Sequence, residues 1–169
     1  MNWTVYLTEC VVSVALFTAA ILIPLRRNPV WWIHDYPEDI QEKYFETHQR
    51  IPTQALSGQV LAKKGCALII CLVVLVGLML LAGAKDFRTC FLYSYGLWLL
   101  VDWYDCFFLD WVLFANMKSI RLPGTEHMDA AYHQKKYHIV HSLIGMALGL
   151  LPCLMCGGIV ALIAKLSSD

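Results

Sequence analysis

Apolar residues in this chain are gathered into long blocks, and they do not recur at the three-to-four-residue spacing of a soluble amphipathic helix. A helix needs about 20 mostly apolar residues to cross the hydrocarbon core of a bilayer. Four blocks meet this requirement, at residues 4–25, 66–84, 87–114 and 138–164. The pattern therefore predicts an all-α fold in which residues 1–169 form a single domain, a membrane-embedded bundle of four transmembrane helices.

The composition agrees with a membrane chain. Hydrophobic residues make up 59% of the sequence and charged residues 15%, whereas a soluble domain is about half apolar and about a quarter charged. The formal net charge is zero, which argues against nucleic acid as a partner because no basic surface would attract it. The expected partner is the lipid bilayer, and the expected location is the cell membrane, where the chain would be a multi-pass protein.

Basic residues are distributed unevenly between the two sides of the predicted bundle, and this asymmetry sets the orientation. Two long loops, between the first and second spans and between the third and fourth, hold most of them: Arg26, Arg27, Lys43, Arg50, Lys63, Lys64, Lys118, Arg121, Lys135 and Lys136. The other side holds only Lys85, Arg88 and Lys165. Both long loops are therefore predicted to be cytosolic, with the N- and C-termini outside.

The first long loop contains a helix signal. Asp35 is followed three residues later by Glu38, a spacing typical of a capping box, and Pro37 is tolerated in a first helical turn. This predicts a short cytosolic helix over residues 36–48. Such a helix would lie at the membrane surface and anchor the loop.

The second long loop turns at Pro123-Gly124 and then carries acids and histidines. Thr125 is a candidate cap for a helix after the turn. His138 and His141 are three residues apart, so they share one helical face where the fourth span begins.

Three acids, Asp102, Asp105 and Asp110, interrupt the predicted third span. One acid at the centre of a membrane helix costs about 2.5–3.5 kcal/mol, so these side chains should face the bundle interior and not lipid. With α-helical geometry all three fall within one broad face. They form either a structural network with neighbouring Trp, Tyr or Lys side chains, or a site for a cation or a proton.

The combination of WIHDYPEDIQ in the first long loop, DCFFLDWVLF in the third span and RLPGTEHM with a later histidine resembles a family of bacterial four-span membrane proteins that has no activity attached to it. The resemblance covers most of the chain. It implies that Asp105, Asp110, Glu126 and His138 occupy matching positions, whereas Asp102, His127, His133 and His141 belong less clearly to the pattern.

The leading hypothesis is a metal or acid–base site at the cytosolic membrane face. Its expected ligands or proton carriers are Asp105, Asp110, Glu126, His138 and His141. Carboxylates together with imidazoles suit a divalent Zn, Fe or Mn ion. No HExxH or paired CxxC spacing is present, and no catalytic nucleophile or cofactor motif is recognisable, so the sequence does not decide whether the chain is an enzyme.

The first alternative is transport of protons or cations. Glu9, Asp102 and the two deeper acids trace a discontinuous acidic path through the predicted bundle. Four spans are few for a monomeric pathway, so this alternative requires a homo-oligomer. Gly149, Gly157 and Gly158 offer small surfaces for close helix contact.

The second alternative is thiol redox chemistry. Cys153 and Cys156 form a CxxC within the fourth span. Four spans with a CxxC resemble quinone-linked disulfide-forming membrane enzymes, but this sequence lacks a second cysteine pair in an external loop. Free cysteines in membrane helices more commonly serve as small packing residues. A structural subunit with no chemistry of its own also remains open.

Cysteine labelling from outside the cell tests the predicted orientation. In a background without the seven native cysteines, cysteines introduced beside Lys85 and Lys165 should react with a membrane-impermeant maleimide. Cysteines beside Lys63 and Lys135 should react only after permeabilisation, because basic loops stay in the cytosol. Reaction from outside beside Lys63 would show that the predicted orientation is wrong.

Overall fold

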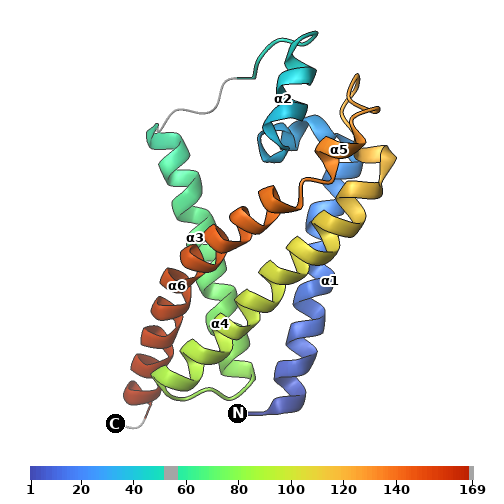
Figure 1. The fold of residues 1–169 in the computed structure, drawn as a ribbon. Coiled ribbons are helices and arrows are strands. Elements are labelled where there is room, and N and C mark those ends of the chain that lie inside the picture. The colour runs from blue at the N-terminus through green and yellow to red at the C-terminus, as the bar shows by residue number, and fades with distance from the viewer. Residues whose placement is uncertain (52–56, 168–169) are drawn as a thin grey trace. The chain divides into compact units, whose positions relative to one another are not determined.

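The computed structural model describes residues 1–51 and 57–167, and every regular element in these ranges is helical (Figure 1). The α-helices are α1 (Trp3–Arg27), α2 (Glu38–Phe45), α3 (Gly58–Leu81), α4 (Phe87–Tyr104), α5 (Asp129–Tyr132) and α6 (Lys135–Leu166). The short 3-10 helices are η1 (Pro29–Asp35) and η3 (Lys118–Ile120), and η2 (Asp105–Phe114) is a π-helix that continues directly from α4. The predicted all-α class is confirmed for the described residues.

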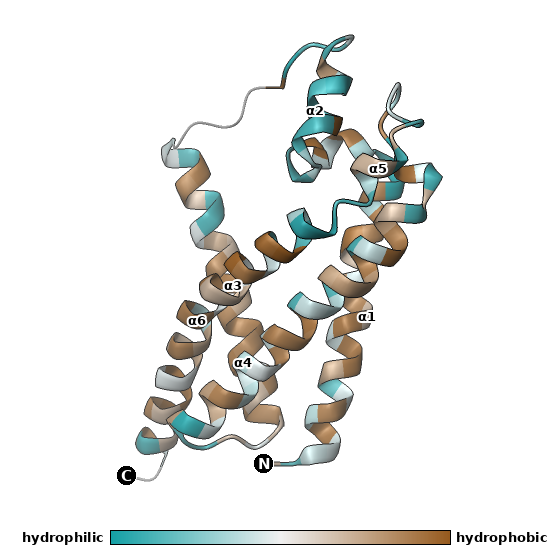
Figure 2. Cartoon of the chain, in the orientation of Figure 1, coloured by the Kyte–Doolittle hydropathy of each residue, from teal (hydrophilic) through white to brown (hydrophobic). Residues whose placement is uncertain are grey.

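Three helical stretches are long and apolar enough to cross a membrane: Trp3–Arg27, Gly58–Leu81 and Asp129–Leu166. Many of their large apolar side chains are exposed, a pattern that suits lipid and would be unfavourable in water. Figure 2 shows apolar residues along α1, α3 and α6, and hydrophilic residues on α2. These are features of an integral membrane protein.

The predicted third span is divided between α4 and the π-helix η2. It is not among the three stretches that qualify by length and apolar composition. The four-span topology therefore stays a prediction.

The chain forms two compact units. The first unit comprises Met1–Ser13, Gln54–Asp102 and Ile144–Asp169, and the second comprises Val14–Thr53 and Trp103–Leu143. The helices α1 and α6 contribute residues to both, and the boundary in the third predicted span lies near the junction of α4 and η2.

The core of the first unit is built by α1, α3, α4 and α6. Its buried members are Tyr6, Cys10, Leu75, Met79, Ala82, Ala84, Cys90, Leu97, Cys153, Cys156 and Val160. Two hydrogen bonds hold the start of α1 in this unit: the backbone N–H of Asn2 donates to the carbonyl of Ala82 at 2.7 Å, and the Tyr6 hydroxyl donates to the carbonyl of Tyr93 at 3.0 Å. The chain end is thereby tied to the turn after α3 and to α4.

Glycines in α6 allow α4 to pack closely against it. A Cβ added at Gly149 would overlap the indole of Trp98, and one added at Gly145 would overlap the carboxylate of Asp102. The Trp98 indole N–H donates to the carbonyl of Gly145 at 3.0 Å. Small residues permit this close approach of two helices. Gly149 and Gly157, which the sequence offered for contacts between copies, are covered instead by Trp98 and Phe87 of the same unit.

The core of the second unit combines aromatic and aliphatic side chains. Its buried members are Leu25, Ile33, Tyr36, Ile40, Tyr44, Phe114, Ile120, Leu122, Ala131 and Tyr132. The Tyr36 hydroxyl donates to the carbonyl of Ile120 at 2.7 Å, and burial raises the pKa of this hydroxyl, so it stays a neutral donor. This bond connects the segment after η1 to the end of η3.

The helix predicted in the first long loop is confirmed as α2, but both predicted caps are wrong. No side chain caps the start of α2, because Pro37 stands at that position and Asp35 ends η1. Thr125 does not begin a helix, since its hydroxyl donates to the carbonyl of Leu122 at 2.7 Å and lies 2.7 Å from the Tyr132 hydroxyl. The next helix, α5, begins at Asp129.

Substitution of the α6 glycines tests the packing of α4 on α6. Gly149→Ala should destabilise the protein by about 1–3 kcal/mol, because the new methyl group meets the Trp98 indole and forces one helix to move. Gly158→Ala, in the same helix with open space around it, should be neutral or stabilising by up to about 1 kcal/mol. Thermal unfolding in a mild detergent measures both. Equal midpoints for the two variants would contradict the proposed contact.

Candidate functional site

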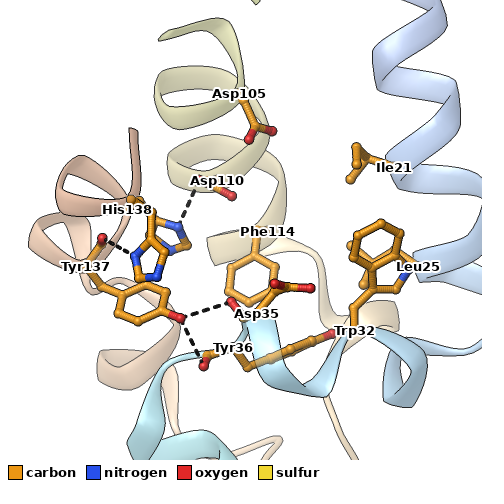
Figure 3. Close-up of a pocket in the computed structure, with 11 residues that line it drawn as sticks. Ile21, Leu25, Trp32, Asp35, Tyr36, Asp105, Asp110, Phe114, Tyr137 and His138 are labelled. Carbon is orange, nitrogen blue, oxygen red and sulfur yellow. Dashed lines mark hydrogen bonds and ion pairs between the residues drawn. The ribbon is translucent and has the colours of Figure 1, made fainter. Parts of the chain in front are cut away.

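The second unit contains a pocket of about 260 Å³ whose wall combines acids, histidines and aromatic rings (Figure 3). The residues that line it are Ile21, Leu25, Trp32, Asp35, Tyr36, Asp105, Asp110, Phe114, Tyr137, His138 and His141. They come from α1, from η1 and the residue after it, from η2 and from α6. Segments far apart in sequence thus supply the titratable groups of one cavity.

The π-helix η2 brings Asp105 and Asp110 to this pocket together. A π-helix bonds each residue to the fifth one along, so residues five apart lie on nearly the same face. The N–H of Ala115 donates to the carbonyl of Asp110 in this pattern at the end of η2. Figure 3 shows both carboxylates extending from η2 at the pocket. The α-helical geometry assumed for this segment was wrong: it placed the two acids about 140° apart at opposite edges of one broad face, and the π-helix brings them closer together.

Asp110 and His138 form a hydrogen bond inside the site. The Nδ1 atom of His138 lies 2.9 Å from an oxygen of Asp110, and the imidazole is 6% exposed and packs edge-on against Phe114. A carboxylate beside Nδ1 fixes the proton on that nitrogen and leaves Nε2 as the functional atom. The Nε2 atom is buried and has no hydrogen-bond partner among the described residues. It is therefore an unsatisfied acceptor inside the site.

Tyr137 and His141 complete the same side of the pocket. The Tyr137 hydroxyl lies 3.3 Å from the carbonyl oxygen of Tyr36 and 3.4 Å from that of Asp35, and it donates to these oxygens. Nδ1 of His141 donates to the carbonyl of Tyr137 at 2.9 Å. A carbonyl can only accept, so Nδ1 carries the proton and Nε2 is the remaining ring nitrogen of His141.

Asp35 is exposed as a residue, but its carboxyl lies beside the walls of the pocket. The surrounding walls remove water from it, and this desolvation raises its pKa against the opposing effect of His34 and His141. None of the lining residues is Lys or Arg, while three are Asp. The pocket therefore has a negative potential that attracts cations and repels anions.

Four of the five predicted ligands line this pocket: Asp105, Asp110, His138 and His141. The fifth, Glu126, is exposed in the loop before α5, where backbone N–H groups of Glu126 and Gly124 lower its pKa. Within residues 1–51 and 57–167, no three His, Cys, Asp or Glu side chains lie close enough together to hold a metal ion. The four predicted side chains thus line one pocket but do not converge on a single point.

The sequence did not indicate the other residues of the pocket, among them Trp32, Asp35 and Tyr137. Tyr137 could have been found, because it lies four residues before His141 on one helical face. Trp32 and Asp35 precede α2 in a segment that was interpreted only as a surface anchor, and nothing in their local pattern indicates a cavity.

Glu9 and Asp102, the two other acids predicted at membrane depth, belong to the first unit. Glu9 is 8% exposed, and neither of its carboxyl oxygens has a hydrogen-bond partner among the described residues. One carboxyl oxygen of Asp102 also lacks a hydrogen-bond partner among the described residues, and this carboxylate packs against Gly145. Neither acid lines the pocket of the second unit.

The cysteines of the CxxC are both buried in the first unit. The sulfur of Cys156 lies 3.4 Å from that of Cys90 in α4. Cys156 therefore contacts a thiol on another helix. The CxxC spacing did not predict this contact.

A comparison with protein-family models, curated proteins and solved structures finds nothing that matches this chain. The residues of the pocket are therefore the basis for a functional proposal.

Replacement of Asp35 tests its desolvation. Because burial raises the pKa of Asp35, the folded protein holds this proton to higher pH than the unfolded chain does, and the free energy of unfolding falls as pH rises between the two values. Asp35→Asn should therefore be at least as stable as the wild type at neutral pH. The difference should vanish below the ordinary Asp pKa of about 3.9, where both states are protonated.

Thermal unfolding of the empty protein in detergent over a pH series measures this effect. Glu42→Gln, on the exposed surface of α2, is the matched control and should follow the wild type at every pH. A midpoint for Asp35→Asn well below that of the wild type at neutral pH would mean that the carboxylate stabilises the fold.

Proposed function

We propose that this chain is a membrane protein whose second unit binds a cation in the pocket between α1, η1, η2 and α6. The observation that carries the proposal is the lining itself. Three carboxylates and two imidazoles surround one cavity of about 260 Å³ with no Lys or Arg among them. Carboxylates held in a partly dehydrated cavity are unfavourable unless a positive charge compensates them.

The energetic argument favours a cation over a purely structural role. At an effective dielectric constant near 20, a unit charge 4 Å from a carboxylate gains about 4 kcal/mol. His138 donates a hydrogen bond to Asp110 across the 2.9 Å contact, and partial desolvation is a penalty that raises the pKa of Asp35. A bound cation would remove that penalty.

A divalent Zn, Fe or Mn ion is one candidate occupant. Asp110 and His138 would then be its first ligands, since a carboxylate and an imidazole suit these metals. Because no three donor side chains of the described residues converge on one point, water would have to complete the coordination. An acid–base reaction on a bound cation would use Nε2 of His138.

We also propose the four-span topology, with the pocket at the cytosolic membrane face. Arg26 and Arg27 end α1, and the next segment contains Trp31 and Trp32. Basic residues followed by tryptophans are typical of the cytosolic interface.

A second candidate function is proton- or cation-coupled transport by an oligomer. The observation that favours it is Glu9, a buried carboxyl with no hydrogen-bond partner for either oxygen among the described residues. Ionisable groups at membrane depth are commonly part of an ion or proton pathway. Ion flux into proteoliposomes distinguishes transport from binding alone.

Cation binding by the purified protein tests the proposed function. Protein prepared in mild detergent without a histidine tag should bind at least one of Zn²⁺, Mn²⁺, Fe²⁺ or a small organic ammonium ion in calorimetry. Asp110→Asn and His138→Gln should each weaken this binding by about tenfold or more, which corresponds to about 1.4 kcal/mol.

The controls are His48→Ala and Glu42→Gln, a histidine and an acid of the same unit that do not line the pocket. Both should bind like the wild type. If no cation of either class binds, or if binding survives both pocket substitutions, the proposed function is wrong.

A further inference from the structure

The volume of the pocket and the separation of its ligating side chains suit an occupant larger than a bare ion. The cavity volume of about 260 Å³ compares with about 30 Å³ for one water molecule in the liquid. No three metal-ligating side chains of the described part of the chain lie close together. A metal would have to bring much of its own hydration shell, whereas an organic cation would fill the cavity with its own atoms.

The lining of the pocket has two chemically different sides. Figure 3 shows Ile21, Leu25 and Trp32 on one side and Tyr137 and His138 on the other. The carboxylates lie between these sides in the same view, together with the ring of Phe114. An occupant complementary to this lining combines an apolar body with a positive charge. The indole of Trp32 can also attract a cation through its π face.

The polar atoms of the pocket call for a ligand with N–H groups. Asp110 fixes the proton of His138 on Nδ1, so the buried Nε2 presents a lone pair with no donor among the described residues. The carboxylates are likewise acceptors. A primary ammonium supplies three N–H donors, whereas a quaternary ammonium supplies none.

The charge of the lining excludes anionic groups from the ligand. A phosphate or carboxylate in the cavity would face three Asp side chains, and no Lys or Arg is among the lining residues. Like charges inside one cavity repel each other. Zwitterionic phospholipids are therefore poor candidates, while an amine without a phosphate fits.

Building on the proposed cation site, we propose that the pocket binds a primary or secondary amine, in its ammonium form, attached to a small apolar body. The positive charge of the ammonium group faces the acidic wall formed by Asp35, Asp105 and Asp110, and one of its N–H groups is directed to Nε2 of His138. The apolar body packs on Ile21, Leu25 and Trp32. Such an amine could be delivered from water or, with a longer chain, from the bilayer.

Calorimetry on the full chain in lipid nanodiscs tests this proposal with four probes. The probes are 2-phenylethylamine, its N,N,N-trimethyl analogue, phenylacetate and Zn²⁺. The primary amine should bind, the trimethyl analogue should bind about tenfold more weakly, and phenylacetate should not bind. Dodecylamine, titrated in the same way, distinguishes delivery from the bilayer: tighter binding than 2-phenylethylamine indicates a membrane source, and weaker binding indicates an aqueous one.

Two neighbouring tryptophans give a matched pair of variants. Trp32→Leu removes an aromatic wall of the pocket and should weaken amine binding about tenfold while leaving any Zn²⁺ binding unchanged. Trp31→Leu changes a side chain that is 70% exposed and outside the lining, and it should have no effect. His138→Gln should weaken the primary amine more than the trimethyl analogue, because only the primary amine donates to Nε2.

The outcomes separate this proposal from the cation site on which it rests. If Zn²⁺ binds and Asp110→Asn abolishes its binding while no amine binds, the cation site stands and the amine proposal is overturned. If neither binds, both are wrong. If the amine binds equally to the wild type, Trp32→Leu and His138→Gln, it only partitions into the bilayer, and the amine proposal is again overturned.

Discussion

In η2 each backbone hydrogen bond spans one residue more than in an α-helix, and the pocket of the second unit depends on this register. Asp105 and Asp110 are five residues apart and both line the cavity. On an α-helix they would be about 140° apart, at opposite edges of one broad face, and the π-helical register brings them closer together. π-Helical segments are rare and are frequent at functional sites, because they turn side chains to positions that an α-helix does not offer.

The acids of the pocket differ in how their burial is compensated. Asp110 has the imidazole of His138 at 2.9 Å, whereas desolvation dominates at Asp35 and raises its pKa. A carboxyl whose pKa is raised by desolvation adds no stability to the empty protein through its charge, and this suits a role in binding. Sites of this kind commonly lower stability in exchange for function.

The sequence predicted the helical class, the short helix of the first long loop and four residues of the pocket, because hydrophobic blocks, turn residues and acids at membrane depth are visible locally. It could not predict the π-helix, since DCFFLDWVLF is equally compatible with an α-helix. Nor could it predict that Trp32 and Asp35 join His138, because tertiary packing alone brings those segments together. Glu126 was included for its neighbours in sequence, yet its loop leaves it exposed.

The buried acids of the first unit bear on the choice between binding and transport. Asp102 packs so closely on α6 that Gly145 can carry no side chain, and close packing leaves little room for a hydrated ion beside it. A pathway through Asp102 would therefore pass protons from group to group, or require α4 and α6 to separate. The pocket of the second unit has open volume beside its carboxylates. Binding in that pocket thus needs no rearrangement of the packed helices, and this favours a binding site over a continuous cation pathway.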